Sequence, residues 1–395
     1  MNESVVIAGS LAQKPRQGGH TWQFLQYLLG FRRLGWRVLF IDCLQPEMCV
    51  DADGRPTSLE RSVNLRYFLQ IMDDFNLKDD FTLIYNNGDQ FIGQPRSDVL
   101  ERTRQSSFLI NVMGFLRDES ILDHARRRVF LDTDPGYGQM WQDMGLAEMF
   151  SSHDDYVTIA ENIGQTDCSI PTCGIDWITW HQPIVLDSWA ATSLEAGGAF
   201  TCIGSWRGPY GPIEYRGKTY GLRVHEFRKF ITLPDLTGQP FEAALDIHPA
   251  EVHDLAQLRE NGWQLVDPRV VTAHPFVYRS YIQRSKAELM VARNMYVATN
   301  CGWFSERSIC YLASGRPVLA QDTGFRSLFP TGQGLVPFAT LDEAVYGVEE
   351  ISRDYNKHAR AAREIAETYF DSDKVIADLV DKLSSSRRPK REIAR

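Results

Sequence analysis

A strand, a helix and a second strand within the first 42 residues place the strongest constraint on the fold. Residues 4–8 (SVVIA) form an apolar run typical of a buried strand. A loop over residues 9–19 follows, and apolar residues then recur at helical spacing over residues 22–34. Gly35 stands where a helix end favours a left-handed residue, and residues 37–42 (RVLFID) indicate the second strand. Because such a unit pairs its strands in parallel through a right-handed crossover, the chain begins as an α/β protein.

The same alternation continues along the chain. In the first half we expect further strands at residues 81–85, 108–112 and 129–132. In the second half we expect strands at 199–204, 241–247, 263–266, 295–299 and 317–320, and helices at 224–230, 250–260, 286–293 and 307–314. Between the halves, residues 182–199 lose their periodicity and include Gly197-Gly198, as expected of a linker. With 395 residues, two α/β domains with a cleft between them are the expected architecture.

Composition excludes several classes of protein. Hydrophobic residues make up 43% and charged residues 24%, which is ordinary globular usage. The net charge of −9 disfavours a protein that binds nucleic acid along its phosphates. No apolar run has the roughly 18 residues that a membrane helix needs, and no signal peptide is recognisable, so we expect a cytoplasmic protein. Seven scattered cysteines indicate reduced core thiols rather than a metal site.

Two nucleotide-binding motifs are only partly matched. Residues 211–219 (GPIEYRGKT) approach a P-loop, but five residues rather than four separate the glycines. The loop after the first strand lacks the G-x-G-x-x-G pattern that a nicotinamide dehydrogenase would carry. Neither motif therefore supports a function.

The most informative segment is residues 300–324 (NCGWFSERSICYLASGRPVLAQDTG). Small and hydroxyl-bearing residues precede an expected helix, and the next strand ends before Asp322–Gly324. Phosphates bind at helix starts because free N–H groups and the helix dipole favour an anion. Ser305 and Ser308 offer hydroxyl groups there, and Arg307 adds positive charge. The alternative is that Ser305 serves only as a helix N-cap.

The order of these motifs carries a resemblance. Ser305–Ser308, Ala313–Leu319 (ASGRPVL) and Asp322–Gly324 follow the order of a hydroxyl or acidic cluster, A-x-G-x-P-V-V and D-x-G. In this the segment resembles the nucleotide-sugar-binding domain of GT-B-fold glycosyltransferases, in particular the family-4-like enzymes (glycosyl transferases group 1). Residues 332–379 resemble the closing helices of that group. Residues 301–305 (CGWFS) are similar to the H-C-G-W-N-S box of plant-type sugar transferases.

The N-terminal half agrees with this resemblance. Residues 15–20 (PRQGGH) and 34–38 (LGWRV) match the family's paired glycines and the G-h-x-V that follows its first helix. The region from about 85 to 266 matches little. The family's E-x7-E pair is not intact, because Ala313 stands seven residues after Glu306.

The resemblance implies a fold and a domain division. The fold would be α/β with two Rossmann-like domains whose parallel sheets face a cleft, the GT-B type. We predict an N-terminal acceptor-side domain over 1–185, a linker over 186–198, a C-terminal nucleotide-sugar-binding domain over 199–383 and a disordered basic tail over 384–395.

The resemblance also implies a donor site. Ser305, Arg307 and Ser308 would stabilise the departing diphosphate, and Asp322 with the following two amides would orient the sugar. The residues expected to bind the donor are Gly18, Gly19, Arg284, Lys286, Ser305, Arg307, Ser308, Asp322, Thr323 and Gly324.

His20 is the candidate catalytic base. It ends a loop at a helix start, where an imidazole can face an acceptor hydroxyl. Inverting enzymes of the fold use a histidine in that loop, and Asp132 or Asp134 would hold its tautomer. The alternative for His20 is a helix-capping role. Asp132-Thr133-Asp134 also resembles the D-x-D metal motif of another sugar-transferase fold, but it lies in the wrong domain, so a structural or orienting role is favoured.

The resulting prediction is a glycosyltransferase of the hexosyltransferase type. It would move a sugar from a nucleoside-diphosphate sugar, with UDP or TDP favoured, to a hydroxyl or similar nucleophile of an unidentified acceptor, for which a small molecule is favoured. The donor is a co-substrate, and no metal or other cofactor is expected. A nucleotide-sugar epimerase of the same fold and a non-catalytic sugar-nucleotide-binding protein are the alternatives.

Overall fold

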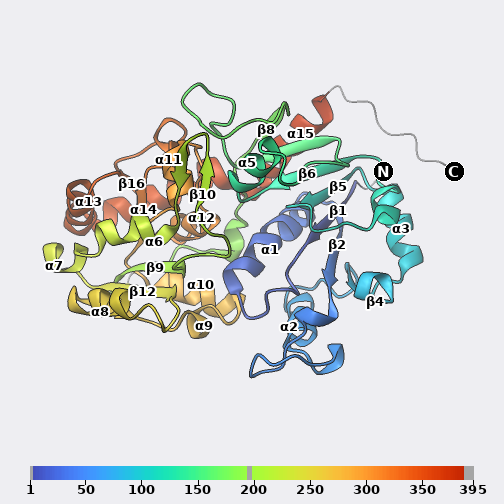
Figure 1. The fold of residues 1–395 in the computed structure, drawn as a ribbon, viewed down its shortest axis with the longest axis horizontal. Helices are drawn as coiled ribbons and strands as arrows, with labels where there is room; N and C mark the ends of the chain where they lie inside the picture. Colours follow the sequence, from blue (N-terminus) through green and yellow to red (C-terminus); the bar gives the residue numbers. More distant parts are fainter. Residues whose placement is uncertain (1–2, 194–197, 387–395) are drawn as a thin grey trace.

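Two main sheets, one from each half of the chain, organise the computed structural model, which describes residues 3–193 and 198–386 (Figure 1). The N-terminal sheet has the strand order β4-β3-β2-β1-β5-β6-β7-β8, and only β4 runs antiparallel to its neighbour. Its strands are β1 (Ser4–Gly9), β2 (Arg37–Leu44), β3 (Phe81–Tyr85), β4 (Gln90–Gly93), β5 (Phe108–Val112), β6 (Arg128–Asp132), β7 (Asp155–Thr158) and β8 (Trp177–Thr179). The helices of this half are α1 (Gly18–Arg33), α2 (Val63–Asp74), α3 (Arg96–Gln105), α4 (Glu119–Leu122) and α5 (Tyr137–Asp143).

The C-terminal sheet is parallel throughout, in the order β13-β12-β9-β14-β15-β16. Its strands are β9 (Phe200–Ser205), β12 (Phe241–Asp246), β13 (Trp263–Leu265), β14 (Ala287–Met290), β15 (Val318–Gln321) and β16 (Leu335–Phe338), and a separate hairpin pairs β10 (Ile213–Tyr215) with β11 (Lys218–Tyr220). The helices are α6 (Arg223–Phe227), α7 (Leu233–Thr237), α8 (Val252–Glu260), α9 (Pro268–Val271), α10 (Pro275–Arg284), α11 (Asn294–Thr299), α12 (Glu306–Ala313), α13 (Leu341–Arg353), α14 (Tyr355–Ile365) and α15 (Ser372–Ser385).

Both sheets reverse their strand order at one point, and this fixes where ligands bind. The reversal lies between β1 and β5 in the first sheet and between β9 and β14 in the second. In parallel α/β sheets, ligands bind beyond the carboxyl ends of the strands at such a switch point. The loops after these four strands are therefore the first places to look for a site.

The structure exchanges two elements of the sequence-based prediction. Residues 286–293 were expected to be a helix and 295–299 a strand, but β14 covers 287–290 and α11 covers 294–299. The helix-favouring residues Ala287, Glu288, Leu289 and Met290 become a strand because all four are buried between β9 and β15. Tertiary burial here overrides intrinsic propensity.

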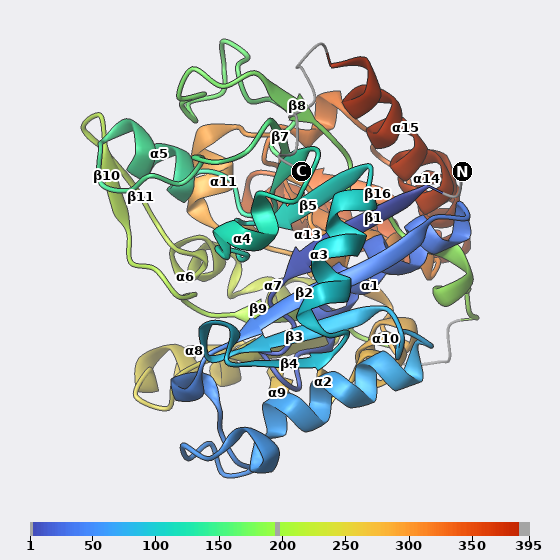
Figure 2. The same cartoon turned by 90° about the vertical axis from the view of Figure 1, so that its right-hand side faces the viewer.

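The last helix returns to the first half of the molecule. α15 packs against α1, and Figure 2 shows both helices along the same flank. Gly30 allows the close approach, since a Cβ at this position would lie 2.3 Å from Ile376 Cδ1. Trp180 Nε1 donates to the Val375 carbonyl at 2.8 Å. The sequence-based division had assigned this helix to the domain over 199–383, because its pattern does not show which sheet it covers.

Parts of the predicted linker and tail lie outside the described residues. These are residues 194–197 of the linker and 387–395 of the tail, whereas Ser384 and Ser385 close α15. No helix in the described ranges is long and apolar enough to cross a membrane. All seven cysteines lie within these ranges, and all are free thiols.

Candidate functional site

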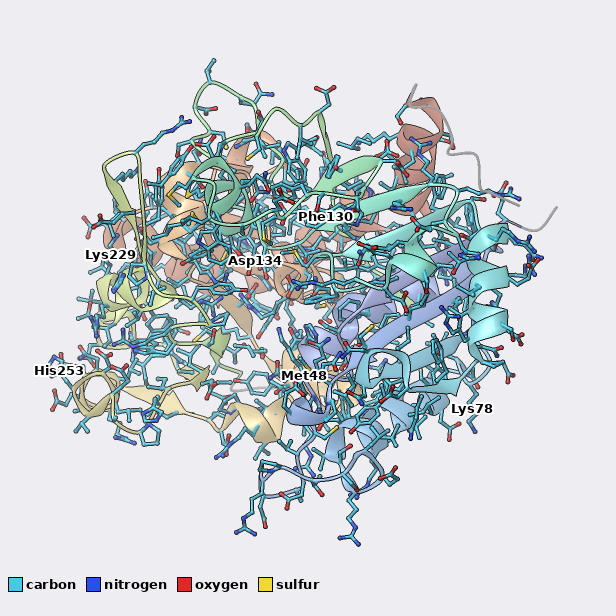
Figure 3. All side chains as sticks on the ribbon, turned by 45° about the vertical axis from the view of Figure 1, so that its right-hand side comes forward. Met48, Lys78, Phe130, Asp134, Lys229 and His253 are labelled. Atoms are coloured by element: carbon cyan, nitrogen blue, oxygen red, sulfur yellow. The ribbon has the colours of Figure 1, made fainter. Side chains whose placement is uncertain are left out.

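A cleft of about 2190 Å³ separates the two sheets. Loops at the carboxyl ends of strands in both sheets line it, including those after β1, β2, β5, β6, β9 and β14. Two of the lining residues, Met48 and Asp134, lie toward the middle of the molecule in Figure 3. The lining contains nine Lys and Arg side chains against seven Asp and Glu, although the whole chain carries a net charge of −9. The cleft therefore favours anions more than the rest of the surface does.

The loop after β9 forms the centre of the C-terminal side. Gly204 has φ +151°, and a Cβ there would lie 2.1 Å from Arg223 Nη1. Gly208 has φ +92°, and Arg293 Nη2 lies 3.9 Å from the place of its Cβ. Glycine at these positions lets the backbone adopt left-handed angles and lets the Arg223 guanidinium pack directly on the loop. Residues 204–208 therefore run between two arginine side chains.

Three arginines, Arg223, Arg293 and Arg307, line this side of the cleft. Arg307 Nε donates to Glu288 at 2.6 Å, and Arg293 Nη1 lies 2.8 Å from both oxygens of Asp134. Burial, and then the charges of Arg307 and Arg293, lower the pKa of Arg223 to about 9. Within the described ranges Arg223 has no carboxylate partner; its Nη1 donates to the Ile203 carbonyl at 3.2 Å. A cation that is desolvated and left without a counterion favours binding of an anion.

The buried carboxylate of Glu226 holds two of these arginines in place. It accepts hydrogen bonds from Lys229, Asn294 and Gln321 at 2.6–2.8 Å. Burial opposes its charge, but these bonds hold the pKa of Glu226 below its usual value. Asn294, which follows Arg293, also accepts from the backbone N–H of Gly221, two residues before Arg223. One network thus connects the start of α6, which carries Arg223, with the segment that carries Arg293.

His20 lines the opposite side of the cleft, on α1. Its Nε2 lies 3.1 Å from the Ser10 carbonyl oxygen. Because a carbonyl oxygen only accepts hydrogen bonds, the proton is assigned to Nε2, and Nδ1 keeps its lone pair. Burial, and then the charge of Lys14, lower the pKa of His20 to about 3. The imidazole is therefore neutral near pH 7, but its affinity for a proton is far below that of a well-matched base.

The lowered pKa of His20 should appear as acid sensitivity. In the unfolded chain a histidine has a pKa near 6.5, whereas His20 in the folded chain has a pKa of about 3. Between these two pH values the unfolded state binds a proton and the folded state does not. The free energy of unfolding therefore decreases as the pH falls through this range. Between pH 7 and pH 5 the wild type should lose about 2 kcal/mol more unfolding free energy than His20→Gln. Urea denaturation of both proteins at the two pH values measures the difference, and equal losses would contradict the assignment.

The structure does not pair His20 with Asp132 or Asp134. The buried Asp132 carboxylate accepts from Gln139 Nε2 at 2.6 Å, Thr158 Oγ1 at 2.9 Å and the backbone N–H of Asp134 at 3.1 Å. Burial raises the pKa of Asp132 to about 6. The Asp134 carboxylate lies against Arg293. The Ser10 carbonyl therefore orients the His20 ring in place of the predicted carboxylate.

A helix starts at Ser305 as predicted, but the three predicted phosphate-binding residues there lie in different environments. Ser305 and Arg307 line the cleft, and Ser305 Oγ accepts from the backbone N–H of Arg307 at 3.3 Å as the N-cap of α12. Ser308 Oγ is buried within the helix packing, where no hydrogen-bond partner lies among the described residues. Two of the three predicted residues are thus brought to the cleft.

Arg284 and Lys286 are not brought to the cleft. Both precede β14, so they lie at the amino end of the parallel sheet, opposite the edge where the cleft opens. The Arg284 guanidinium stacks over Tyr281 at 4.5 Å, and Lys286 Nζ donates to Gln239 Oε1 at 2.7 Å. Arg293, which follows the strand, is the basic residue at the correct end.

Three of the remaining predicted donor residues, Gly18, Gly19 and Gly324, make contacts between the domains instead. Gly18 and Gly19 pack against α10, and a Cβ on Gly18 would lie 2.7 Å from the His274 carbonyl oxygen. The loop Asp322–Gly324 lies outside the cleft lining. Asn162 Nδ2 donates to the Gly324 carbonyl at 3.2 Å, and Thr323 Oγ1 donates to the Trp303 carbonyl. Close backbone approach thus accounts for these glycines.

Four residues of this site were not predicted from the sequence: Gly204, Arg223, Glu226 and Arg293. The signal for Arg293 was present, because a basic residue directly after a buried apolar run marks a strand end, but the run was assigned to a helix. No signal paired Gly204 with Arg223, because the two residues meet only in the folded chain.

Comparison with known proteins gives matches in structure alone. No protein-family model matches the chain, and no curated protein matches it by sequence. An α-glucosyltransferase in complex with UDP and a 13-mer DNA aligns with TM-score 0.57 at 11% identity, over 98% of this chain and 100% of its own. Anabaena Alr3699/HepE in complex with UDP aligns with TM-score 0.53 at 11% identity, over 97% and 100%. The N-terminal domain of Candida albicans trehalose-6-phosphate phosphatase aligns with TM-score 0.57 at 10% identity, over 98% and 97%.

Alignment over almost the whole length covers both sheets and the cleft between them. At identities this low, the likeness concerns the fold. The expected architecture of two Rossmann-like domains facing a cleft is confirmed, and the chain has the GT-B fold.

Proposed function

We propose that this protein is a glycosyltransferase that moves a sugar from a nucleoside-diphosphate sugar to a hydroxyl of an acceptor. The observation that carries the proposal is the group of three arginines at the switch point of the C-terminal sheet: Arg223 and Arg293 lie against the loop 204–208, and Arg307 lines the same cleft. Two structural neighbours are complexes with UDP, which favours a UDP-sugar, with a TDP-sugar as the alternative.

The arginines suit the chemistry of the leaving group. When the bond between the sugar carbon and the diphosphate oxygen breaks, the electron pair and its negative charge pass to the diphosphate. Guanidinium groups that are already in place stabilise this charge without reorganisation. Ser305, at the start of α12, faces the same cleft. The proposed reaction uses the nucleotide sugar as co-substrate and no metal or other cofactor.

The N-terminal side suits a hydroxylated acceptor. The side-chain amides that line it are those of Gln13, Gln17, Gln23, Gln45 and Asn87. Amide groups both donate and accept hydrogen bonds, as sugar and polyol hydroxyls do. His20 lies among them and, in its neutral form, can accept a hydrogen bond at Nδ1. We therefore propose a small hydroxylated molecule as the acceptor, with His20 on its side of the cleft.

Isothermal titration with UDP, TDP and GDP tests the donor site. Arg223→Met and Arg293→Met should each weaken binding of the preferred nucleotide by about 10- to 100-fold, since each removes a charge-assisted contact. Arg284→Ala, an exposed arginine at the opposite end of β14, is the matched control and should leave binding unchanged. If the wild type binds none of the three nucleotides, the proposal is wrong. Acceptor-dependent release of UDP then separates a transferase from a binding protein.

A further inference from the structure

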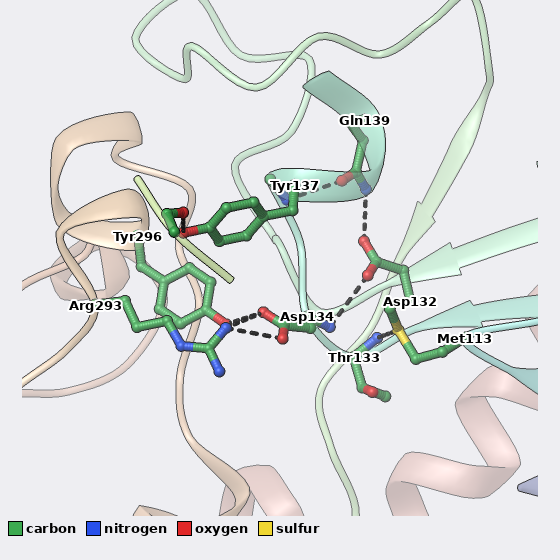
Figure 4. Close-up of polar contacts among 10 residues, drawn as sticks. Met113, Asp132, Thr133, Asp134, Tyr137, Gln139, Arg293 and Tyr296 are labelled. Atoms are coloured by element: carbon green, nitrogen blue, oxygen red, sulfur yellow. Dashed lines mark hydrogen bonds and ion pairs between the residues drawn. The ribbon is translucent and has the colours of Figure 1, made fainter. Parts of the chain in front are cut away.

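We propose that Asp134 is a positioning residue for the donor: from the N-terminal domain, it orients Arg293 of the C-terminal domain toward the diphosphate. This rests on the proposed function. Figure 4 shows the Asp134 carboxylate facing the Arg293 guanidinium and the Tyr296 hydroxyl across the domain boundary. Asp134 lies two residues after the end of β6, and Arg293 lies directly before α11.

The ion pair uses only part of the arginine. Both carboxylate oxygens lie 2.8 Å from Nη1, and Nη2 lies beside Gly208 on the loop after β9. Nη1 is therefore held, whereas Nε and Nη2 have no hydrogen-bond acceptor among the described residues. An arginine has five N–H donors in a rigid fork, so fixing one nitrogen sets the direction of the others. This geometry presents the remaining donors of Arg293 to an anion in the cleft.

Asp134 is itself held firmly enough to act in this way. The Tyr296 hydroxyl also donates to it, and the Tyr296 ring stacks on Trp303 with centroids 4.3 Å apart. On the other side, the backbone N–H of Asp134 donates to the buried Asp132 carboxylate at 3.1 Å. Asp132 therefore orients the loop that carries Asp134, which gives it a structural role rather than one in catalysis.

The positive charges around Asp134 neutralise its carboxylate, so this carboxylate can orient Arg293 without strongly repelling a bound phosphate. Its carboxylate faces Arg293, and it raises the pKa of Lys14, which burial otherwise lowers. Two cations thus share one carboxylate, and the negative charge is largely neutralised locally. Binding of the donor in the C-terminal domain should consequently depend on how the N-terminal domain is placed.

Titration of the full-length protein with UDP tests this inference. Asp134→Asn should weaken UDP binding by about 5- to 10-fold, and Tyr296→Phe by a smaller factor, because each loosens the hold on Arg293. In the Arg293→Met background, Asp134→Asn should have no further effect, since Asp134 acts through Arg293. Thermal unfolding of each variant shows that the loss does not reflect misfolding.

Asp143→Asn is the matched control. Asp143 also accepts hydrogen bonds across the domain boundary, from Tyr215 Oη at 2.7 Å and Arg216 Nη2 at 3.2 Å, but it lies outside the cleft lining. Its replacement should leave UDP affinity unchanged. If Asp143→Asn weakens binding as much as Asp134→Asn, or if Asp134→Asn binds UDP as well as the wild type or better, the inference is overturned while the proposed function stands. A wild type that binds no nucleotide would overturn both.

Discussion

Gly204→Ala is expected to reduce nucleotide binding by about 100-fold or more, the largest effect on binding of any single change considered. The new Cβ would lie 2.1 Å from Arg223 Nη1, so the guanidinium must leave its place on the loop. The φ of +151° at Gly204 also suits glycine alone, so the loop itself would shift. Loss of Arg223 and displacement of the loop should add to each other. Isothermal titration with UDP measures the effect.

Gly211→Ala provides the control for this change. Gly211 lies in the same connection between β9 and β10, and a Cβ there would meet no atom within 4 Å. The same substitution should therefore leave both UDP affinity and thermal stability unchanged. Binding by Gly204→Ala within threefold of the wild type would show that the Arg223 guanidinium does not contact the nucleotide.

Glu288→Ala is expected to have the largest effect on stability, a loss of about 3–5 kcal/mol. Glu288 is fully buried in β14, and its carboxylate lies 2.6 Å from Arg307 Nε. Burial opposes the charge of Arg307, but Glu288 holds the pKa of Arg307 above its usual value. Without the carboxylate, a desolvated cation would remain with no counterion. Urea denaturation measures the loss.

The double variant Glu288→Leu/Arg307→Met distinguishes an ion-pair effect from a packing effect. Removing both charges together should restore much of the stability, because buried ion pairs are costly mainly when they are broken. Arg353→Ala removes one partner of the exposed Arg353–Glu350 pair and should cost less than about 1 kcal/mol. A double variant as unstable as the single one would mean that Glu288 stabilises the fold through packing rather than through charge.

The fold could largely be predicted from the sequence. For the site, the sequence indicated one segment of the chain but not which of its residues line the cleft. The opening strand, helix and strand were correctly located, because burial and periodicity are local properties. Within the segment 300–324, which was predicted to bind the donor, Ser305 and Arg307 line the cleft, whereas Asp322–Gly324 does not. Arg284 and Lys286, which the resemblance also implied as donor residues, lie outside the cleft lining, before β14 rather than after it.

The residues that build the anion site come from distant parts of the chain. Asp134 and Arg293 are 159 positions apart, and Gly204 meets Arg223 across a hairpin and a turn. Asp322–Gly324 matches the family motif, yet its backbone contacts the N-terminal domain. A short sequence motif does not predict which part of the folded chain its backbone will contact.

The amino-acid sequence by itself therefore determined the α/β architecture, the division into two sheets and the segment at the start of α12, since each depends on the local pattern of apolar and small residues. Only the tertiary structure decided which charged groups meet. Strand order and crossover place the ends of β6, β9 and β14 around one cleft, and electrostatic interactions between buried groups depend on that placement rather than on separation along the chain.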